Sequence, residues 1–294
     1  MDKLFYEAIP PPIKWKAEQV EEWTSELLIF LKKEKIRSIN IPEVVGESKE
    51  QERTVPLIAK IETLDFIDRL QNHSFPITPI PNLITVHRSE IQLIEWVENA
   101  YRKGVRHLIL VGGEKSSISY PGLQVTTAAR LLRNRFPDLK LGGISIFTRK
   151  NEPDRILRKM ESGIEFFISQ IIYETANMKC VLLNLAKLCQ AAKLPLPRVY
   201  LSLAPAAKLT DIAFLQWLGV EFPSALSSYF SGGGDECVEE RVDEMIDFVL
   251  EELKYFISRK HFNLGFNVEQ VMYHNFPSAQ RLIKHMKQRL SGCL

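Results

Sequence analysis

The sequence predicts a single (β/α)8 TIM barrel spanning residues 1–294. Eight short apolar segments alternate with amphipathic segments along a chain of 294 residues, which is the length and pattern of eight parallel strands that close on themselves. An open, doubly wound sheet is the alternative fold. No G-x-G-x-x-G follows the first strand, where a dinucleotide-binding fold of that kind places it. No Pro- or Ser-rich linker divides the chain, and "SGGGDE" (residues 231–236) is too short to separate two domains.

Strands are expected where short runs are rich in apolar and β-branched residues. In chain order the expected strands are residues 3–9, 37–44, 81–87, 105–113, 139–147, 164–174, 198–205 and 261–267. Helices are expected where apolar residues recur at helical spacing, as Val20, Trp23, Leu27, Phe30 and Leu31 do in the first of them. The expected helices are residues 15–35, 56–72, 89–104, 153–162, 175–192, 236–258 and 277–290.

The composition excludes several classes of protein. A net charge of +2 gives no reason to expect nucleic-acid or membrane-surface partners, and no apolar run is long enough to span a bilayer. The N-terminus lacks the layout of a signal peptide, so a cytoplasmic location is expected. The six histidines and four cysteines show no metal-ligand spacing, so no metal site is expected. Exposed barrel helices often pair, which leaves a homo-oligomer open.

The site of such a barrel lies at the carboxyl ends of its strands. "FYEAIPPP" (residues 5–12) places Glu7 near the end of the first strand, among apolar residues and just before three prolines. Burial disfavours the charged form of a carboxyl group and raises its pKa. A carboxyl group that keeps its proton near neutral pH acts as a general acid. Glu7 is therefore the first catalytic candidate.

Two further segments carry candidate residues. Glu114 follows "LILVGG", where Gly112 and Gly113 would let the backbone approach a planar ligand closely. Gln170 lies in the apolar strand "FFISQIIYE" and offers one donor and one acceptor, as the edge of a heterocycle requires. A hydrogen-bonded core amide is the alternative interpretation of Gln170. The basic segment 148–159 is either a solvated helix start or a landing site for an anion.

Taken together, these segments resemble the methylenetetrahydrofolate reductase family, a group of (β/α)8 barrels that reduce methylenetetrahydrofolate to methyltetrahydrofolate. "FYEAIPPP" resembles the opening strand of the family, whose glutamate is the general acid, and this carries that role to Glu7. "PNLITVHRSEIQLIEWVENAYRKGVRHLILVGGE" matches the third and fourth strands without a gap and puts Glu114 at the position of a pterin-contacting aspartate. "KMESGIEFFISQIIYE" puts Gln170 at the position of a substrate-binding glutamine. "LSLAP" and "NLGFN" stand where the family has its seventh and eighth strands.

The departures from the family fall mainly on its flavin contacts. The arginine that ends the fourth strand of the family is missing, the histidine of its third strand is Asn82, and the threonine of its second strand aligns with Asn40. Val268 replaces the arginine that follows the eighth-strand asparagine. The resemblance therefore implies the type of family member that passes a hydride from NADH or NADPH directly to the folate.

The resemblance also implies a set of roles at the mouth of the barrel. Glu43, after the second strand, would be an additional catalytic carboxylate beside Glu7 and Glu114. Substrate binding is assigned to Gln170, Asn40, Asn82 and Asn267. Cofactor binding is assigned to Gly112, Gly113, Arg158 and Lys159.

Two other functions stay open. One is a conventional reductase that binds FAD through unusual contacts, and the other is a folate- or pterin-binding subunit of a one-carbon complex that catalyses no reduction. All three share a folate-type small molecule as partner. No motif in the sequence distinguishes NADH from NADPH, or tetrahydrofolate from a related pterin.

Overall fold

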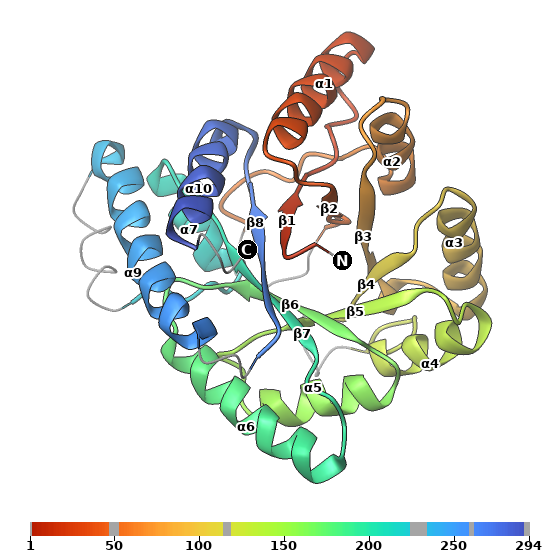
Figure 1. The fold of residues 1–294 in the computed structure, drawn as a ribbon. Helices are drawn as coiled ribbons and strands as arrows, with labels where there is room; N and C mark the ends of the chain where they lie inside the picture. The colour runs from red at the N-terminus through yellow and green to blue at the C-terminus, as the bar shows by residue number, and fades with distance from the viewer. Residues whose placement is uncertain (1, 47–52, 114–118, 224–233, 259–261, 291–294) are drawn as a thin grey trace.

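Eight parallel strands close into a barrel, as the sequence predicts, and neighbours in the chain are neighbours in the barrel from β1 round to β8 (Figure 1). This computed structural model describes all residues except 1, 47–52, 114–118, 224–233, 259–261 and 291–294. The strands are β1 Leu4–Glu7, β2 Ser38–Ile41, β3 Thr78–Ile84, β4 His107–Val111, β5 Lys140–Ser145, β6 Phe166–Ile171, β7 Arg198–Leu203 and β8 Leu264–Glu269.

Helices surround these strands (Figure 1). They are α1 Ala17–Lys33, α2 Thr63–Gln71, α3 Glu90–Arg102, α4 Val125–Arg135, α5 Glu152–Glu161, α6 Ala176–Ala192, α7 Leu209–Trp217, α9 Val238–Ser258 and α10 Phe276–Arg289. Short 3₁₀ turns lie at Thr85–His87, Asp235–Cys237 and Tyr273–Asn275. No helix in the described part of the chain combines the length and apolar character needed to cross a bilayer.

Alternate strand positions fill the interior of the barrel. Successive side chains of a strand point to opposite faces, and one set forms a buried cluster inside the barrel: Phe5, Ile80, Ile109, Phe166, Ile168 and Tyr200. The rings of Phe5 and Tyr200 stack with centroids 3.9 Å apart. Gly265 makes room for this stack, because a Cβ atom there would lie 2.6 Å from the Tyr200 ring.

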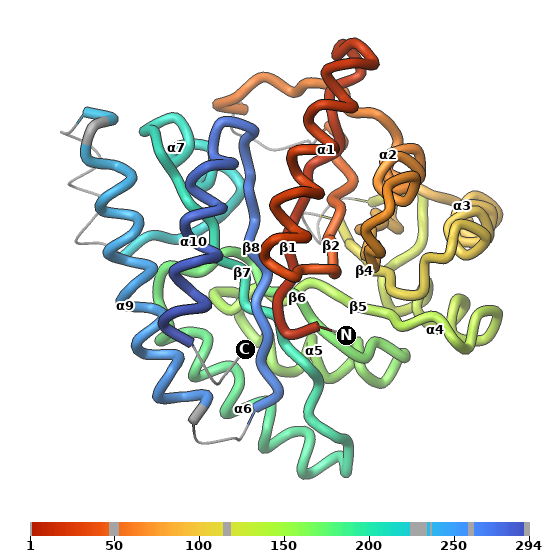
Figure 2. Tube along the Cα trace, turned by 45° about the horizontal axis from the view of Figure 1, so that its top comes forward, coloured from red at the N-terminus to blue at the C-terminus, as the bar shows by residue number. Residues whose placement is uncertain are grey.

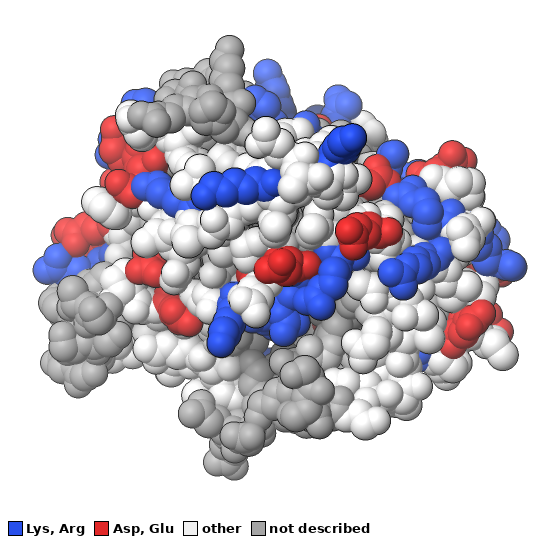
Figure 3. Space-filling model, turned by 90° about the horizontal axis from the view of Figure 1, so that it is seen from below, with Lys and Arg blue, Asp and Glu red and all other residues white. Residues whose placement is uncertain are grey.

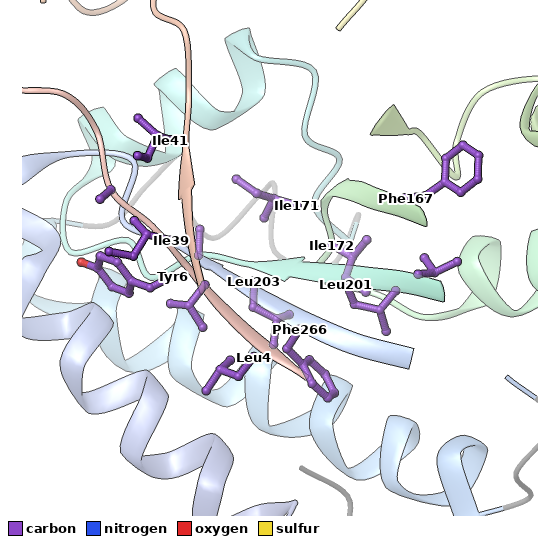
Figure 4. Close-up of a cluster of buried hydrophobic side chains, with 14 of the residues drawn as sticks. Leu4, Tyr6, Ile39, Ile41, Phe167, Ile171, Ile172, Leu201, Leu203 and Phe266 are labelled. Atoms are coloured by element: carbon purple, nitrogen blue, oxygen red, sulfur yellow. The ribbon is translucent and has the colours of Figure 1, made fainter. Parts of the chain in front are cut away.

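The other set of strand side chains packs outward against the helices. Leu4, Tyr6 and Phe266 belong to this larger core (Figure 4). Ile171 and Ile172 also belong to it although they are consecutive, because the pairing of β6 with β7 shifts register between Ile168 and Ile171. The strand alternation therefore breaks close to the mouth of the barrel on β6.

Several observed elements differ from the expected ones. α7 was not expected at all, and β8 runs from Leu264 to Glu269 rather than over residues 261–267. β3 begins at Thr78 rather than residue 81. Pro79 and Pro81 lack backbone N–H groups, but because they are two residues apart the missing donors lie on one side of the strand, and the other side still pairs. α2 begins at Thr63 rather than residue 56, since the preceding segment pairs with the loop after β1 through a bridge between Pro12 and Lys60. Figure 2 shows this orange segment passing beside α1. α4 was not expected, because its buried face is mostly alanine and gives a weak apolar pattern.

Candidate functional site

The carboxyl ends of β1 and β8 bring two glutamates together at the mouth of the barrel. Glu7 and Glu269 are the last residues of these strands and are register partners. Glu7 shares the inward face of β1 with Phe5, and Glu269 shares that of β8 with Asn267. Two carboxyl groups thus end neighbouring strands on the same side of the sheet.

Glu7 is buried, with 9% of the surface of the residue exposed. Its Oε2 accepts a hydrogen bond of 3.1 Å from Nδ2 of Asn40, which lies beside it on β2. Burial raises the pKa of Glu7 well above its ordinary value, and the negative charge of Glu269 raises it further. The sequence predicts the first cause, and the second becomes visible only in the fold.

Glu269 is the residue that the sequence analysis missed. Burial raises its pKa to about 7, although hydrogen bonds from Ser202 and Asn267 act in the opposite direction. Asn267 Nδ2 is 3.2 Å from Glu269 Oε1 and 3.1 Å from Ser202 Oγ. The expected eighth strand ended at Asn267, so a carboxylate two residues later on the same face went unnoticed. The negative charge of Glu269 on the neighbouring strand therefore adds to burial in disfavouring the ionised form of Glu7.

Three asparagine side chains, on β2, β3 and β8, each have an oxygen without a partner within the described residues. Nδ2 of Asn40 and Nδ2 of Asn267 are directed at the carboxyl groups, which orients the two amides. The buried Oδ1 atoms of Asn40, Asn82 and Asn267 form no hydrogen bond within the described structure. Buried polar atoms are normally satisfied. The mouth therefore offers a set of acceptors to a ligand that carries N–H or O–H donors.

Gln170 lies near the carboxyl end of β6, in the stretch where the pairing with β7 shifts register. Its Nε2 donates a hydrogen bond of 3.0 Å to the carbonyl of Leu218, just after α7. It lines a small cavity of about 30 Å³ together with Tyr173 and Gly219. The donor of this amide is thus bonded within the protein. The role of Gln170 in substrate binding stays a prediction.

Glu43 is engaged away from the acid pair. Its carboxylate forms an ion pair with Arg88 and accepts a hydrogen bond of 2.8 Å from the backbone N–H of Ile84. Both residues line a surface cavity of about 440 Å³ beside Trp96 of α3. This pairing ties the loop after β2 to the end of β3, which is a structural role. The catalytic role assigned to Glu43 stays a prediction without a supporting contact.

The glycines after β4 contact a side chain of the protein itself. A Cβ atom on Gly113 would lie 2.2 Å from the ring of Tyr120, and one on Gly112 would lie 3.2 Å from Val125. Tyr120 thus covers the face of Gly113 that was expected to approach a planar ligand. Glu114 lies outside the described residues.

Lys159 reaches back into the protein from α5. Its Nζ donates a hydrogen bond of 2.6 Å to the carbonyl of Ile144, and burial lowers its pKa. Arg158 is exposed. Lysines and arginines gather on the face of the molecule seen from below, with acidic side chains among them (Figure 3). Anion binding by the segment 148–159 stays a prediction.

The described residues contain no group of three His, Cys, Asp or Glu side chains that could hold a metal ion. The mouth itself brings together two carboxyl groups with raised pKa values and several amide side chains. These features define a (β/α)8 barrel with an acidic, amide-lined mouth.

Comparison with known proteins adds a likeness of fold. No protein-family model matches the chain, and no curated protein matches it in sequence. An uncharacterized protein from Clostridium thermocellum, described as binding two copies of 5-methyl-5,6,7,8-tetrahydrofolic acid, has a similar structure with a TM-score of 0.78. The two sequences are 19% identical over 97% of this chain and 95% of the other. At this identity the likeness shows the fold alone.

Two other solved barrels are less similar. The 2,3-dimethylmalate lyase matches with a TM-score of 0.49 and 11% identity over 98% of this chain and 81% of its own. The aldolase QR15 matches with a TM-score of 0.43 and 10% identity over 73% of this chain and 86% of its own. These scores are too low to carry a functional argument.

Proposed function

We propose that this protein binds a reduced folate at the mouth of its barrel and reduces 5,10-methylenetetrahydrofolate to 5-methyltetrahydrofolate with NAD(P)H. The observation that carries the proposal is the Glu7–Glu269 pair, whose carboxyl groups have raised pKa values, together with the nearby strand asparagines whose oxygens lack donors within the described residues. The folate-binding neighbour of similar structure supports the choice of ligand. The resemblance of the sequence to methylenetetrahydrofolate reductases supports the choice of reaction.

The acceptors at the mouth suit the pterin ring. A reduced pterin carries several N–H groups along one edge and no negative charge. The free Oδ1 atoms of Asn40, Asn82 and Asn267 would accept hydrogen bonds from such an edge, and the ionised member of the carboxyl pair would accept another. Hydrogen bonds from the ligand to these oxygens would remove the free-energy cost of leaving them buried without a donor.

Glu7 would supply the proton that starts the reaction. Breaking the bond between the methylene carbon and N10 leaves a pair of electrons on N10, and Glu7 donates its proton there. The methylene carbon then forms a cationic iminium with N5, and a hydride from NAD(P)H adds to it to give the methyl group. The ionised Glu7–Glu269 pair stabilises the positive charge while it exists.

Direct transfer from NAD(P)H is proposed rather than transfer through a bound FAD. Of the positions assigned to a cofactor, Gly113 is covered by Tyr120 and Lys159 is bonded to the carbonyl of Ile144. These positions are not free to receive an isoalloxazine ring or its phosphates in this arrangement. A conventional FAD enzyme and a folate-binding subunit without activity are the alternatives.

The three functions give different results with the purified protein. Under the proposal the preparation is colourless, oxidises NADH or NADPH only when 5,10-methylenetetrahydrofolate is present, and forms 5-methyltetrahydrofolate. Flavin absorbance in the purified protein would point to the conventional enzyme. Tight folate binding without oxidation of either nicotinamide would point to the binding subunit and overturn the reductase.

A further inference from the structure

Three basic residues belong to two loops that run side by side at the rim of the barrel. Lys14 belongs to the loop after β1, and Arg53 and Lys60 belong to the segment between β2 and α2. The two loops run side by side through a bridge between Pro12 and Lys60. Two backbone hydrogen bonds flank this bridge, from Ile13 N to Ala59 O at 3.0 Å and from Ile61 N to Pro11 O at 2.9 Å.

Lys60 lies next to the loops that leave the two carboxyl-bearing strands. Its Nζ is 3.4 Å from the hydroxyl of Tyr273 and 4.6 Å from the centroid of its ring. The same hydroxyl donates a hydrogen bond of 2.6 Å to the carbonyl of Pro10. Pro10 follows Glu7 by three residues, and Tyr273 follows Glu269 by four. The ammonium group therefore stands at the edge of the acid-lined mouth.

The positive charge of this group is not neutralised by the described part of the protein, where no carboxylate forms an ion pair with Lys14, Arg53 or Lys60. Aromatic rings hold the cations instead: Arg53 lies 5.0 Å from the ring centroid of Phe214 and 4.9 Å from that of Trp217. Burial lowers the pKa of Lys60 to about 8, and the charges of Arg53 and Lys14 lower it further. Like charges gathered at a half-buried position destabilise the protein unless an anion binds there.

We propose that Lys14, Arg53 and Lys60 form an anion subsite that binds the charged tail of a ligand whose ring lies in the mouth of the barrel. This inference rests on the proposed function and names the part of the ligand that the rim recognises. Two tails have the required chemistry: the carboxylates of the glutamate portion of the folate, and the phosphates of NAD(P)H. Either would form charge-assisted hydrogen bonds with the three cations.

The experiment measures ligand binding by calorimetry with the full chain. The variants are Lys60→Met, which keeps an unbranched side chain of similar size without the charge, and Lys60→Arg, which keeps the charge. The matched control is Lys33→Met. Lys33 is exposed in the last turn of α1, whereas Lys14 precedes the first turn of the same helix. The ligands are 5-methyltetrahydrofolate, its analogue without glutamate (5-methyltetrahydropteroate), NADH, and reduced nicotinamide mononucleotide.

If the subsite binds the folate tail, Lys60→Met raises the Kd of 5-methyltetrahydrofolate about 10-fold, while the Kd of the pteroate analogue does not change. If it binds phosphates, the same loss appears with NADH and is smaller with the mononucleotide. In either case Lys60→Arg retains most of the affinity, and added salt weakens wild-type binding more than that of Lys60→Met. Equal Kd values for Lys60→Met and Lys33→Met with every ligand would overturn the subsite.

If the proposed function is wrong, the binding experiment gives a different result from the one expected when only the subsite is wrong. In that case the wild-type protein binds neither folate nor nicotinamide, and the subsite is tested with inorganic pyrophosphate and a short γ-glutamate peptide. Binding of either probe that Lys60→Met abolishes and Lys33→Met retains supports the subsite alone. No binding of these probes to the wild type would overturn it.

Discussion

Glu7 of β1 and Glu269 of β8 are register partners at the mouth of the barrel, and each raises the cost of ionising the other. Within the described residues no ion pair neutralises either carboxylate, and the hydrogen bonds to the pair come from the neutral side chains of Asn40, Asn267 and Ser202. Burying two carboxyl groups costs free energy that packing elsewhere must offset. Such an arrangement is expected at a site where a proton is donated.

Replacing Glu7 with Gln should abolish most of the activity while leaving folate bound. The amide has the shape of the carboxylic acid but cannot release a proton to N10, and loss of a general acid typically lowers kcat by about 10²–10⁴-fold. Turnover and the Kd of 5-methyltetrahydrofolate are measured on the same preparation. Glu21→Gln, an exposed change on α1, is the control. Wild-type turnover by Glu7→Gln would remove the general-acid assignment.

Replacing Glu269 with Gln should move the pH dependence of the reaction toward lower pH. The donating form of Glu7 is protonated, so kcat/KM falls as pH rises through the pKa of the pair. The negative charge of Glu269 raises the pKa of Glu7. Without that charge Glu7 loses its proton at a lower pH, although burial still keeps its pKa raised. The measurement is a pH profile of kcat/KM for both proteins, and superimposable descending limbs would contradict the coupling.

The same pair should make the protein less stable as pH rises. A carboxyl group whose pKa is raised in the folded state binds more protons there than in the unfolded state, so its favourable contribution is present in full below the unfolded value of 4.5. That contribution is lost as pH rises through the folded value, which for Glu269 is about 7. Glu269→Gln should therefore exceed the wild type in free energy of unfolding by about 1–3 kcal/mol near pH 8.

The difference between the two proteins should shrink as pH falls and vanish below the unfolded value of 4.5, where Glu269 is neutral in both the folded and the unfolded state. Urea unfolding at several pH values measures it. A constant difference across the range would show that the effect comes from packing rather than from ionisation.

The closed barrel was predictable because strand and helix patterns alternate through nearly the whole sequence, and closure follows from that alternation. The buried state of Glu7 was predictable too, since it ends an apolar strand. Glu269 was not, because its partner is 262 positions away in the chain and only the pairing of β1 with β8 joins them. Two other contacts were not predictable for the same reason, because each joins different loops. They are the ion pair of Glu43 with Arg88 and the packing of the Tyr120 ring against Gly113.

Replacing Gln170 with Ala should weaken substrate binding more than it slows the chemical step. Its amide oxygen can accept a hydrogen bond from a ligand while Nε2 remains bonded to the carbonyl of Leu218. Loss of one such bond should raise KM about 10-fold, with kcat changed by less. Gln190→Ala, at an exposed position on α6, is the control. A fall in kcat at unchanged KM would contradict a binding role.

Adding a methyl group at Gly113 tests whether Tyr120 covers the end of β4 in solution. The new Cβ atom would lie 2.2 Å from the tyrosine ring, so the ring or the backbone must move. Overpacking of this kind costs about 1–3 kcal/mol, and Gly113→Ala should unfold at a lower urea concentration than the wild type. Gly234→Ala is the matched control, because nothing lies within 4 Å of its added Cβ atom. In a Tyr120→Ala background the cost of Gly113→Ala should largely disappear. The same cost in both backgrounds would show that the ring does not occupy this place, and the two glycines would again be open to a planar ligand.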